Sequence, residues 1–437
     1  MMTNVNYFKD QFSALQASDP NDLLSEIRKE NFDTFNRSGL PTLRQEEWKY
    51  TNISSLFDKD YEFAADLEIS PSLLSSLEEM RIKGHQEANE LVFLNGRYIP
   101  SLSAIRSPES HLVVLPLEEA IKSKYKTLVA LHLGQSSSYI KDGIHALNTS
   151  FIQGGLFLYI PKGRRSQHPV YIYHLSDAGQ QHTLSQPRSL VYVESQAKFQ
   201  LAETYKTLGP CESFTNEVME IVVEADAFVE YYKIQNDGSN AHQTNTTHIR
   251  QMEKSHVHTV VLSLNGGTVR NNLNLVMDAR GNETHLYGLS LLRGKTHVDN
   301  HTMIDNKMPD CYSNQLYKSV ADDASTSIFS GRIIVQPDAQ KTNAYQSSKN
   351  ILLSEQASIN AKPQLEIFAD DVKCSHGCTV GQLDEEALYY LRARGIPKEN
   401  AEILLLHAFA ADIIDQIKLE PLQKHTEKLI YEHLSVS

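Results

Sequence analysis

Hydrophobic residues recur at every second position through the middle of the chain, from Gly154 to about Val372. Short runs there are rich in β-branched and aromatic residues and end at polar turns, as in Leu156–Ile160, Val170–Tyr173 and Leu190–Val193. This spacing predicts β-strands, because alternate side chains of a strand lie on opposite faces. No helical pattern separates the strands, so the sequence argues against βαβ units.

A weak repeat links these strands. Val193–Leu201 and Val223–Tyr231 share an apolar residue, a polar turn, a small residue and an alternating strand, and the same shape returns around Gly281, Ala324 and Ala357. A small residue beside each corner suits a tightly turning coil, because its side chain must fit inside the bend. The repeat favours a β-solenoid, in which stacked coils bury one another's apolar faces. A β-sandwich is the competing architecture, but hairpin turns are scarce within the repeat.

The segment before this region has a different period. Leu24, Ile27 and Phe35 follow one another at helical spacing, and Gly39 ends the run. Asn95–Gly96 lies between two apolar runs, which predicts a tight β-hairpin. The first part of the chain is therefore predicted to be helical and mixed.

The end of the chain is helical only. Asp384 and Gly395 are residue types that start and stop a helix, and Pro397 opens a second one. Within that second helix, Ile403–Ile414 is apolar on more than one face, which predicts deep burial or contact with a partner. The candidate partner-binding residues are Ile403, Leu404, Leu405, Phe409 and Ile413. The predicted regions are 1–150, helical and mixed; 151–378, the β-core; and 379–437, helical.

Composition narrows the class of protein. The chain has 437 residues, of which 41% are hydrophobic and 22% charged, as in soluble globular proteins of two or three domains. A net charge of −13 argues against nonspecific nucleic-acid binding, which needs clustered Lys and Arg. No apolar run approaches the roughly 20 residues that span a bilayer, and the first residues lack the pattern of a signal peptide. Four cysteines make no disulfide framework. We therefore expect a cytoplasmic protein with reduced thiols.

Cys374, His376 and Cys378 are the strongest candidates for chemistry. In an extended segment their alternate spacing puts all three side chains on one side. Thiolate and imidazole ligands suit iron, iron–sulfur species, zinc or copper(I). Three ligands from one strand cannot complete a tetrahedral site, so a metal here would be shared with a partner or held transiently. A catalytic Cys–His pair and a plain buried joint are the alternatives.

Weaker signals lie elsewhere. His297, Asp299 and His301 would share one face of a strand and could bind a metal, but the polar outer face of a solenoid has the same pattern. Trp48, among acidic residues, belongs either to a recognition site or to a segment that it anchors. Gly294-Lys295-Thr296 lacks the spacing of a phosphate-binding loop, so we expect no ATP site in this chain.

Motifs spread over essentially the whole chain carry a resemblance to a known family. They are Trp48–Thr51, Asn95–Gly96, Ala146–Thr149, Ala339–Ser354, Pro363–Ile367, Asp371–Gly377 and Tyr389–Gly395. Together they closely resemble the SufB/SufD family of iron–sulfur cluster assembly proteins. Within that family the chain is similar to the SufD branch, because His376-Gly377 stands where SufB typically has His-Glu and no cysteine-pair motif lies near the N-terminus.

The resemblance implies a mainly β fold: a right-handed parallel β-helix core with an N-terminal mixed region and a C-terminal helical region. It implies a non-catalytic, cytoplasmic scaffold in a complex with SufB and with SufC, the ATPase, which docks on the C-terminal helices. A nascent iron–sulfur cluster would assemble near the interface with SufB. Cys374 and His376 would bind it, and Cys378, where SufD proteins commonly have alanine, is a further candidate ligand. The resemblance also implies that the isolated chain can self-associate as a homodimer.

Two other classes stay open on the sequence. A carbohydrate-active β-helix enzyme would need carboxylates or basic residues gathered on an exposed coil face, and usually an export signal. A structural solenoid adaptor without metal chemistry needs neither feature.

Overall fold

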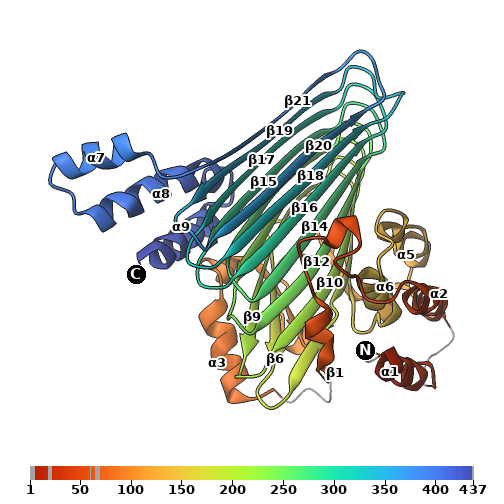
Figure 1. Ribbon diagram of the computed structural model, residues 1–437. Coiled ribbons are helices and arrows are strands. Elements are labelled where there is room, and N and C mark those ends of the chain that lie inside the picture. Colours follow the sequence, from red (N-terminus) through yellow and green to blue (C-terminus); the bar gives the residue numbers. More distant parts are fainter. Residues whose placement is uncertain (1–4, 18–21, 60, 64–68, 436–437) are drawn as a thin grey trace.

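The chain forms a parallel β-solenoid with helices attached near both ends of the sequence, as the computed structural model shows (Figure 1). The structure describes residues 5–17, 22–59, 61–63 and 69–435. Successive strands along the coil alternate between two sheets, and the strands of one sheet are stacked side by side in parallel. The predicted mainly β solenoid is confirmed. The competing β-sandwich is wrong, because the stacked strands pair in parallel, whereas the sheets of a β-sandwich are antiparallel.

The strands are shared between two sheets. Sheet A contains β1 (Tyr61–Phe63), β4 (Val113–Pro116), β5 (Leu156–Ile160), β7 (His182–Ser185), β8 (Arg188–Val193), β10 (Ser213–Val223), β12 (Ala241–Gln251), β14 (Thr268–Met277), β16 (His297–Asn306), β18 (Thr326–Val335) and β20 (Ser358–Ile367). Sheet B contains β2 (Asn89–Leu94), β3 (Arg97–Tyr98), β6 (Val170–Asp177), β9 (Lys198–Leu208), β11 (Phe228–Asn236), β13 (His256–Asn265), β15 (Glu283–Leu292), β17 (Tyr312–Ala321), β19 (Asn343–Leu352) and β21 (Lys373–Gly381).

The corners that lead from sheet A to sheet B explain the sequence repeat. Gln196 and Asp226 have left-handed backbones, with φ of 65° and 58°, and each amide donates to a carbonyl of the next corner. Ala197 and Ala227 follow directly and are fully buried inside the bend, as predicted. Ala324 lies in a corner that leads from sheet B back to sheet A, between β17 and β18. There the buried small residue is Ser325 rather than the predicted Ala324, which is half-buried.

The core between the two sheets contains an apolar cluster. It includes Ile172, Leu201, Ile221, Tyr231 and Leu275, all essentially inaccessible to solvent. Buried polar side chains share this interior from the first coils onward. The predicted hairpin at Asn95–Gly96 is confirmed: it joins β2 to β3, and both residues have positive φ, 48° and 80°. Through β2 and β4, residues of the N-terminal region extend both sheets.

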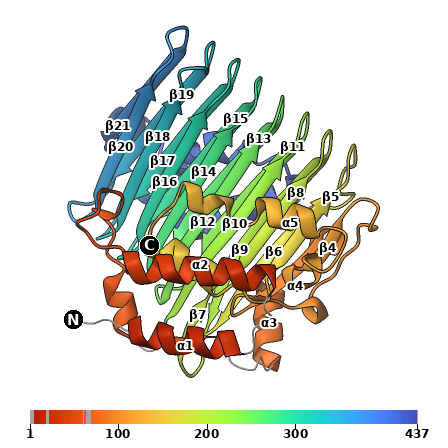
Figure 2. The same ribbon diagram turned by 90° about the vertical axis from the view of Figure 1, so that its right-hand side faces the viewer.

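Helices of the N-terminal region cover the outer face of sheet A, as Figure 2 shows. They are α1 (Val5–Ala17), α2 (Leu23–Ser38), α4 (Leu117–Ala120), α5 (Lys126–His132), α6 (Gly143–Ser150) and the short 3-10 helices η1 (Glu46–Trp48), η2 (Ser54–Asp58) and η5 (Gln135–Ser138). The predicted helix ending at Gly39 is confirmed as α2, which Asp22 caps. An aromatic cluster including Phe12, Phe32 and Phe35 joins these helices to Phe214 of β10.

Sheet B is covered by other helices. They are α3 (Pro71–Met80), η3 (His85–Glu87), η4 (Pro100–Leu102), α8 (Lys398–Ile414) and α9 (Glu420–Ser435), whereas α7 (Glu385–Ala393) has no buried residue and packs on α8. Leu406, Ile413 and Ile430 pack with outward residues of sheet B in one apolar cluster. The α7–α8 hairpin extends away from the solenoid (Figure 1). Within the described ranges, no helix combines the length and the apolar character needed to cross a membrane.

Candidate functional site

The solenoid is uncovered at the end that carries the three predicted ligands. Strand β21 pairs with β19 on one side, and no strand of the described residues pairs with its other edge or with that of β20. Most residues of β20 and β21 are half-buried or exposed, whereas every residue of β10 is buried. An unpaired edge of this kind leaves backbone N–H and C=O groups available to another chain.

The register of β21 directs the predicted ligands to the inner side of the coil. Cys374 pairs with Ala344 and His376 pairs with Gln346, and both partners are buried between the sheets. Cys378 pairs with Ser348, which is also buried. Since strands in register present the same face at paired positions, the two thiols and the imidazole face the open interior of the last coil. The prediction that they share one side is confirmed.

The three side chains differ in exposure. Cys374 is half-buried and packs against the core between the sheets, whereas His376 and Cys378 are exposed. Burial raises the pKa of the Cys374 thiol, so it stays protonated at neutral pH until a metal or a positive partner displaces the proton. The Asn350 amide lies 3.9 Å from the sulfur of Cys378.

These residues do not form a compact site by themselves. In the part of the chain that the structure describes, only His174, Glu203 and Glu217 place three potential ligand atoms within 4.8 Å of one another. Neighbouring members of the β21 set are two residues apart on a strand, which separates them by about 6–7 Å. A metal bound here would therefore need ligands from a second chain.

The compact group lies deep inside the solenoid, where a lysine already supplies the positive charge. The Nζ atom of Lys233 lies 3.1 Å from Glu203 and 3.0 Å from Glu217. His174 Nε2 lies 3.1 Å from the other oxygen of Glu203 and 3.4 Å from that of Glu217. All four side chains are buried. A divalent cation would meet the ammonium at short range, so the group is better explained as a closed ion cluster.

Electrostatics distinguishes the two carboxyl groups. Burial acts to raise the pKa of Glu203, but the charges of Lys233 and His174 outweigh it and hold that pKa well below its usual range. Burial and the neighbouring Glu203 raise the pKa of Glu217. Sequence patterns had not indicated this cluster, because its members come from four strands whose stacking only the fold defines.

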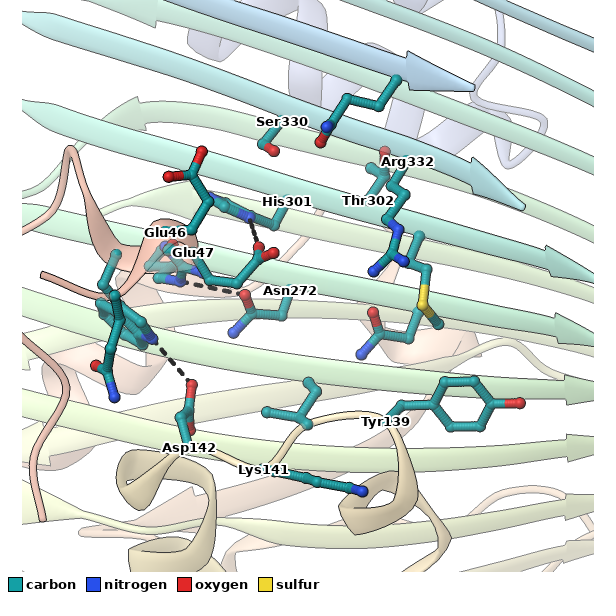
Figure 3. Close-up of a pocket in the computed structure, with 17 residues that line it drawn as sticks. Glu46, Glu47, Tyr139, Lys141, Asp142, Asn272, His301, Thr302, Ser330 and Arg332 are labelled. Atoms are coloured by element: carbon teal, nitrogen blue, oxygen red, sulfur yellow. Dashed lines mark hydrogen bonds and ion pairs between the residues drawn. The ribbon is translucent and has the colours of Figure 1, made fainter. Parts of the chain in front are cut away.

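The segment around Trp48 docks on the outer face of sheet A, and Figure 3 shows the groove that it borders. Trp48 is buried, stacks 4.0 Å from the Arg270 guanidinium and donates to Asp142 over 3.1 Å. The interpretation of Trp48 as an anchor is confirmed. The groove has a volume of about 350 Å³ and is bordered by η1, the segment after η5 and strands β14, β16 and β18.

The same docking accounts for the histidines of β16. Thr51 donates to Asp299 over 2.5 Å and lies 2.9 Å from the imidazole of His297. His301 is paired with Asp299 at 2.9 Å and with Glu47 at 3.3 Å. Burial acts to raise the pKa of Asp299, but His301 and Arg270 hold it below its usual range. The metal prediction for these residues stays a prediction, and the contacts of their side chains are those of a docked segment.

The five predicted partner-binding residues, all on α8, differ in exposure. Ile413 is buried against sheet B, while Ile403, Leu405 and Phe409 are half-buried. Leu404 is exposed. Lys318 of β17 holds α8 in place: its Nζ atom donates to the Phe409 carbonyl over 2.8 Å and pairs with Asp412 at 2.5 Å.

The sequence pattern did not predict that the aromatic residues of α7 are exposed. Tyr389 and Tyr390 are strongly exposed, and α7 has no buried residue. The signal was present as two adjacent tyrosines beside Leu391, but the helical pattern alone does not tell which face a neighbouring element covers.

Comparison with known proteins shows the family to which the chain belongs. Residues 174–409 match the sequence model described as SUF system FeS cluster assembly, SufBD core domain, and residues 2–172 match that of the SufBD protein N-terminal region. The chain belongs to the SufBD family. The predicted resemblance is thereby confirmed, as is its link to iron–sulfur cluster assembly in the SUF system.

SufBD-family relatives match over most of the chain. An iron–sulfur cluster assembly SufBD family protein of Synechocystis is 31% identical over 94% of this chain and 91% of its own length. The iron–sulfur cluster assembly protein SufD of Escherichia coli is 28% identical over 91% of this chain and 90% of its own. The protein of the same name from Bacillus subtilis is 29% identical over 67% of this chain and 68% of its own.

Proposed function

We propose that this SufBD-family chain is a SufD-type scaffold subunit that works in the cytoplasm with SufB and the ATPase SufC. The observation that supports this most is the uncovered last coil, which presents Cys374, His376 and Cys378 toward an open interior. The ligand set is incomplete in one chain, and the edges of β20 and β21 are free for another chain to extend. The nascent iron–sulfur cluster would be the cargo of this interface.

The residues of the last coil suit such a cargo. His376 offers an exposed imidazole, and Cys374 offers a thiol beside the core, both soft or borderline ligands for iron. Cys378 is an additional thiol on the same face. The chain itself would orient and expose these groups, while the partner would complete the coordination. In this proposal the subunit performs no catalysis of its own.

ATP hydrolysis is assigned to SufC. Gly294-Lys295-Thr296 lies in a turn between strands β15 and β16 and opens no helix, which fits the absence of a phosphate-binding loop from the sequence. The α7–α8 hairpin would be the docking element for SufC, because it extends from the solenoid and exposes Leu404, Tyr389 and Tyr390.

Substitution of His376 by alanine tests the ligand role. We expect His376→Ala to assemble with SufB and SufC but to lose most of its cluster formation, because an exposed side chain contributes little to folding. Cluster formation is followed by anaerobic iron and sulfide reconstitution of the complex, with absorption and Mössbauer spectra. Ser375→Ala is the matched control, since Ser375 lies on the same strand with the opposite orientation.

Normal cluster formation by the His376→Ala complex would refute the ligand role. It would leave the alternative of a structural solenoid adaptor without metal chemistry.

A further inference from the structure

The side chain next to His376 on the neighbouring strand is buried and only half satisfied. Gln346 pairs with His376 in the register of β19 and β21, and 3% of its surface is exposed. Its Nε2 atom donates to the Gln315 amide oxygen over 3.0 Å. Its Oε1 atom is buried without a hydrogen-bond partner among the described residues. A buried amide oxygen left unpaired is costly, so it requires an explanation.

The fold fixes this amide firmly. Gln315 Oε1 also accepts from Thr302 over 3.0 Å, so the acceptor of the Gln346 amide is itself held. Gly331 of β18 faces the same amide across the interior, and a methyl group at residue 331 would overlap it. The site is therefore shaped to admit the glutamine: a glycine provides the space and a second glutamine provides the bond.

The register leaves the last coil as the side toward which the free oxygen can turn. Gln315 belongs to β17, one coil before Gln346, and His376 belongs to β21, one coil after it. The oxygen and nitrogen of an amide diverge from the same carbon, so with Nε2 held by the coil behind, Oε1 is free to point toward the coil ahead. His376 is exposed, and its ring has no hydrogen bond to any described residue, so the ring is able to turn inward.

We propose that Gln346 is a positioning residue for His376: its Oε1 accepts a hydrogen bond from the Nδ1–H of His376 and leaves Nε2 free to bind the cargo. The inference rests on the ligand role of His376 proposed above. Histidines that bind metals are commonly held by such a bond, which fixes both the tautomer and the direction of the ring. Removal of the partner typically lowers metal affinity or activity by about 10–100-fold.

The tautomer of His376 tests the proposal directly. The chain is labelled with ¹⁵N-histidine, and two-bond ¹H–¹⁵N spectra are recorded above the pH at which imidazole titrates. The His376 signals are identified by their loss in His376→Asn. We expect the Nδ1–H tautomer in the wild-type chain. Gln346→Met should shift the ring toward the Nε2–H form that free imidazole favours, whereas Gln346→Glu, which keeps an acceptor oxygen, should retain the wild-type form.

Three results separate the inference from the function on which it rests. A wild-type spectrum with the Nε2–H tautomer would overturn the inference without any variant having to fold. An identical tautomer in wild-type and Gln346→Met proteins would overturn it as well. If instead the tautomer shifts as expected but His376→Ala still builds clusters normally, the positioning bond exists and the proposed ligand role fails. With both correct, Gln346→Met should reduce cluster formation by about 10–100-fold.

Discussion

At the residue scale, buried histidines tie the N-terminal region to sheet A. Ser136 of η5 donates to Glu220 over 2.7 Å and lies 3.0 Å from the imidazole of His145. Arg188 pairs with Glu220 at 2.6 Å. Burial lowers the pKa of His145 to about 3 and that of His248 to about 4. Both rings are therefore neutral in the folded chain at physiological pH.

These shifts predict that acid weakens the fold. A histidine with a folded pKa below its unfolded value of about 6.5 contributes stability above that pH, and the contribution is lost as the pH falls toward the folded pKa. For His248 the loss at pH 5 is about 2 kcal/mol. Urea unfolding at pH 7.5 and pH 5 should show this difference in the wild-type chain, and His248→Gln should reduce it by about the same amount.

Equal pH dependence in wild-type and His248→Gln proteins would contradict the prediction.

At the scale of single elements, the α7–α8 hairpin combines a fixed base with a free tip. Lys318 and the apolar cluster around Ile413 hold the second half of α8 on sheet B. Leu404, by contrast, is 50% exposed and lies in the first half of α8, the half that follows α7. An apolar helix can therefore serve two purposes along its length, packing on its own fold and presenting a surface to a partner.

This division predicts which residues contact SufC. Leu404→Glu should weaken binding of SufC by about tenfold or more, because a charge would be buried at the centre of the contact. Isothermal titration calorimetry of the chain with SufC measures the affinity. Tyr431→Glu, on the exposed face of α9, should bind as the wild type does. Equal affinity for Leu404→Glu and wild type would place the docking surface elsewhere.

At the scale of the whole molecule, the solenoid is covered unevenly. Helices pack on both outer faces, but no element of the described residues caps the last coil, which exposes Phe368 and Val380. Repeat folds normally protect their terminal coils, since a free edge invites pairing with another chain. We therefore expect assembly at the uncovered end, with a second copy in the isolated chain and with SufB in the proposed complex.

A charge at this end should therefore block self-association. Val380→Lys should convert a homodimer into a monomer of 49.3 kDa, because the lysine would face the interior of the shared coil. Size-exclusion chromatography with light scattering gives the mass. Leu131→Lys, at an exposed position on α5, should remain dimeric. A monomeric wild-type chain, or a dimeric Val380→Lys variant, would contradict this prediction.

The sequence by itself determined the class of fold and the position of the candidate site. Alternation between hydrophobic and polar residues identified strands such as Leu156–Ile160, and the small residues Ala197 and Ala227 marked the corners. These features are local, because the period of a strand and the space inside a bend depend on neighbouring residues only. The spacing of Cys374 and His376 also followed from local geometry.

The tertiary structure alone decided which distant residues meet. The Glu203–Lys233 cluster and the row from Gln315 to His376 join residues of different coils. The docking of Thr51 on Asp299 joins the N-terminal region to β16. Paired residues of successive coils are roughly thirty positions apart, and this offset varies, so the register between coils cannot be read from a local period. The physical reason is that stacking, rather than sequence spacing, sets which side chains share the interior.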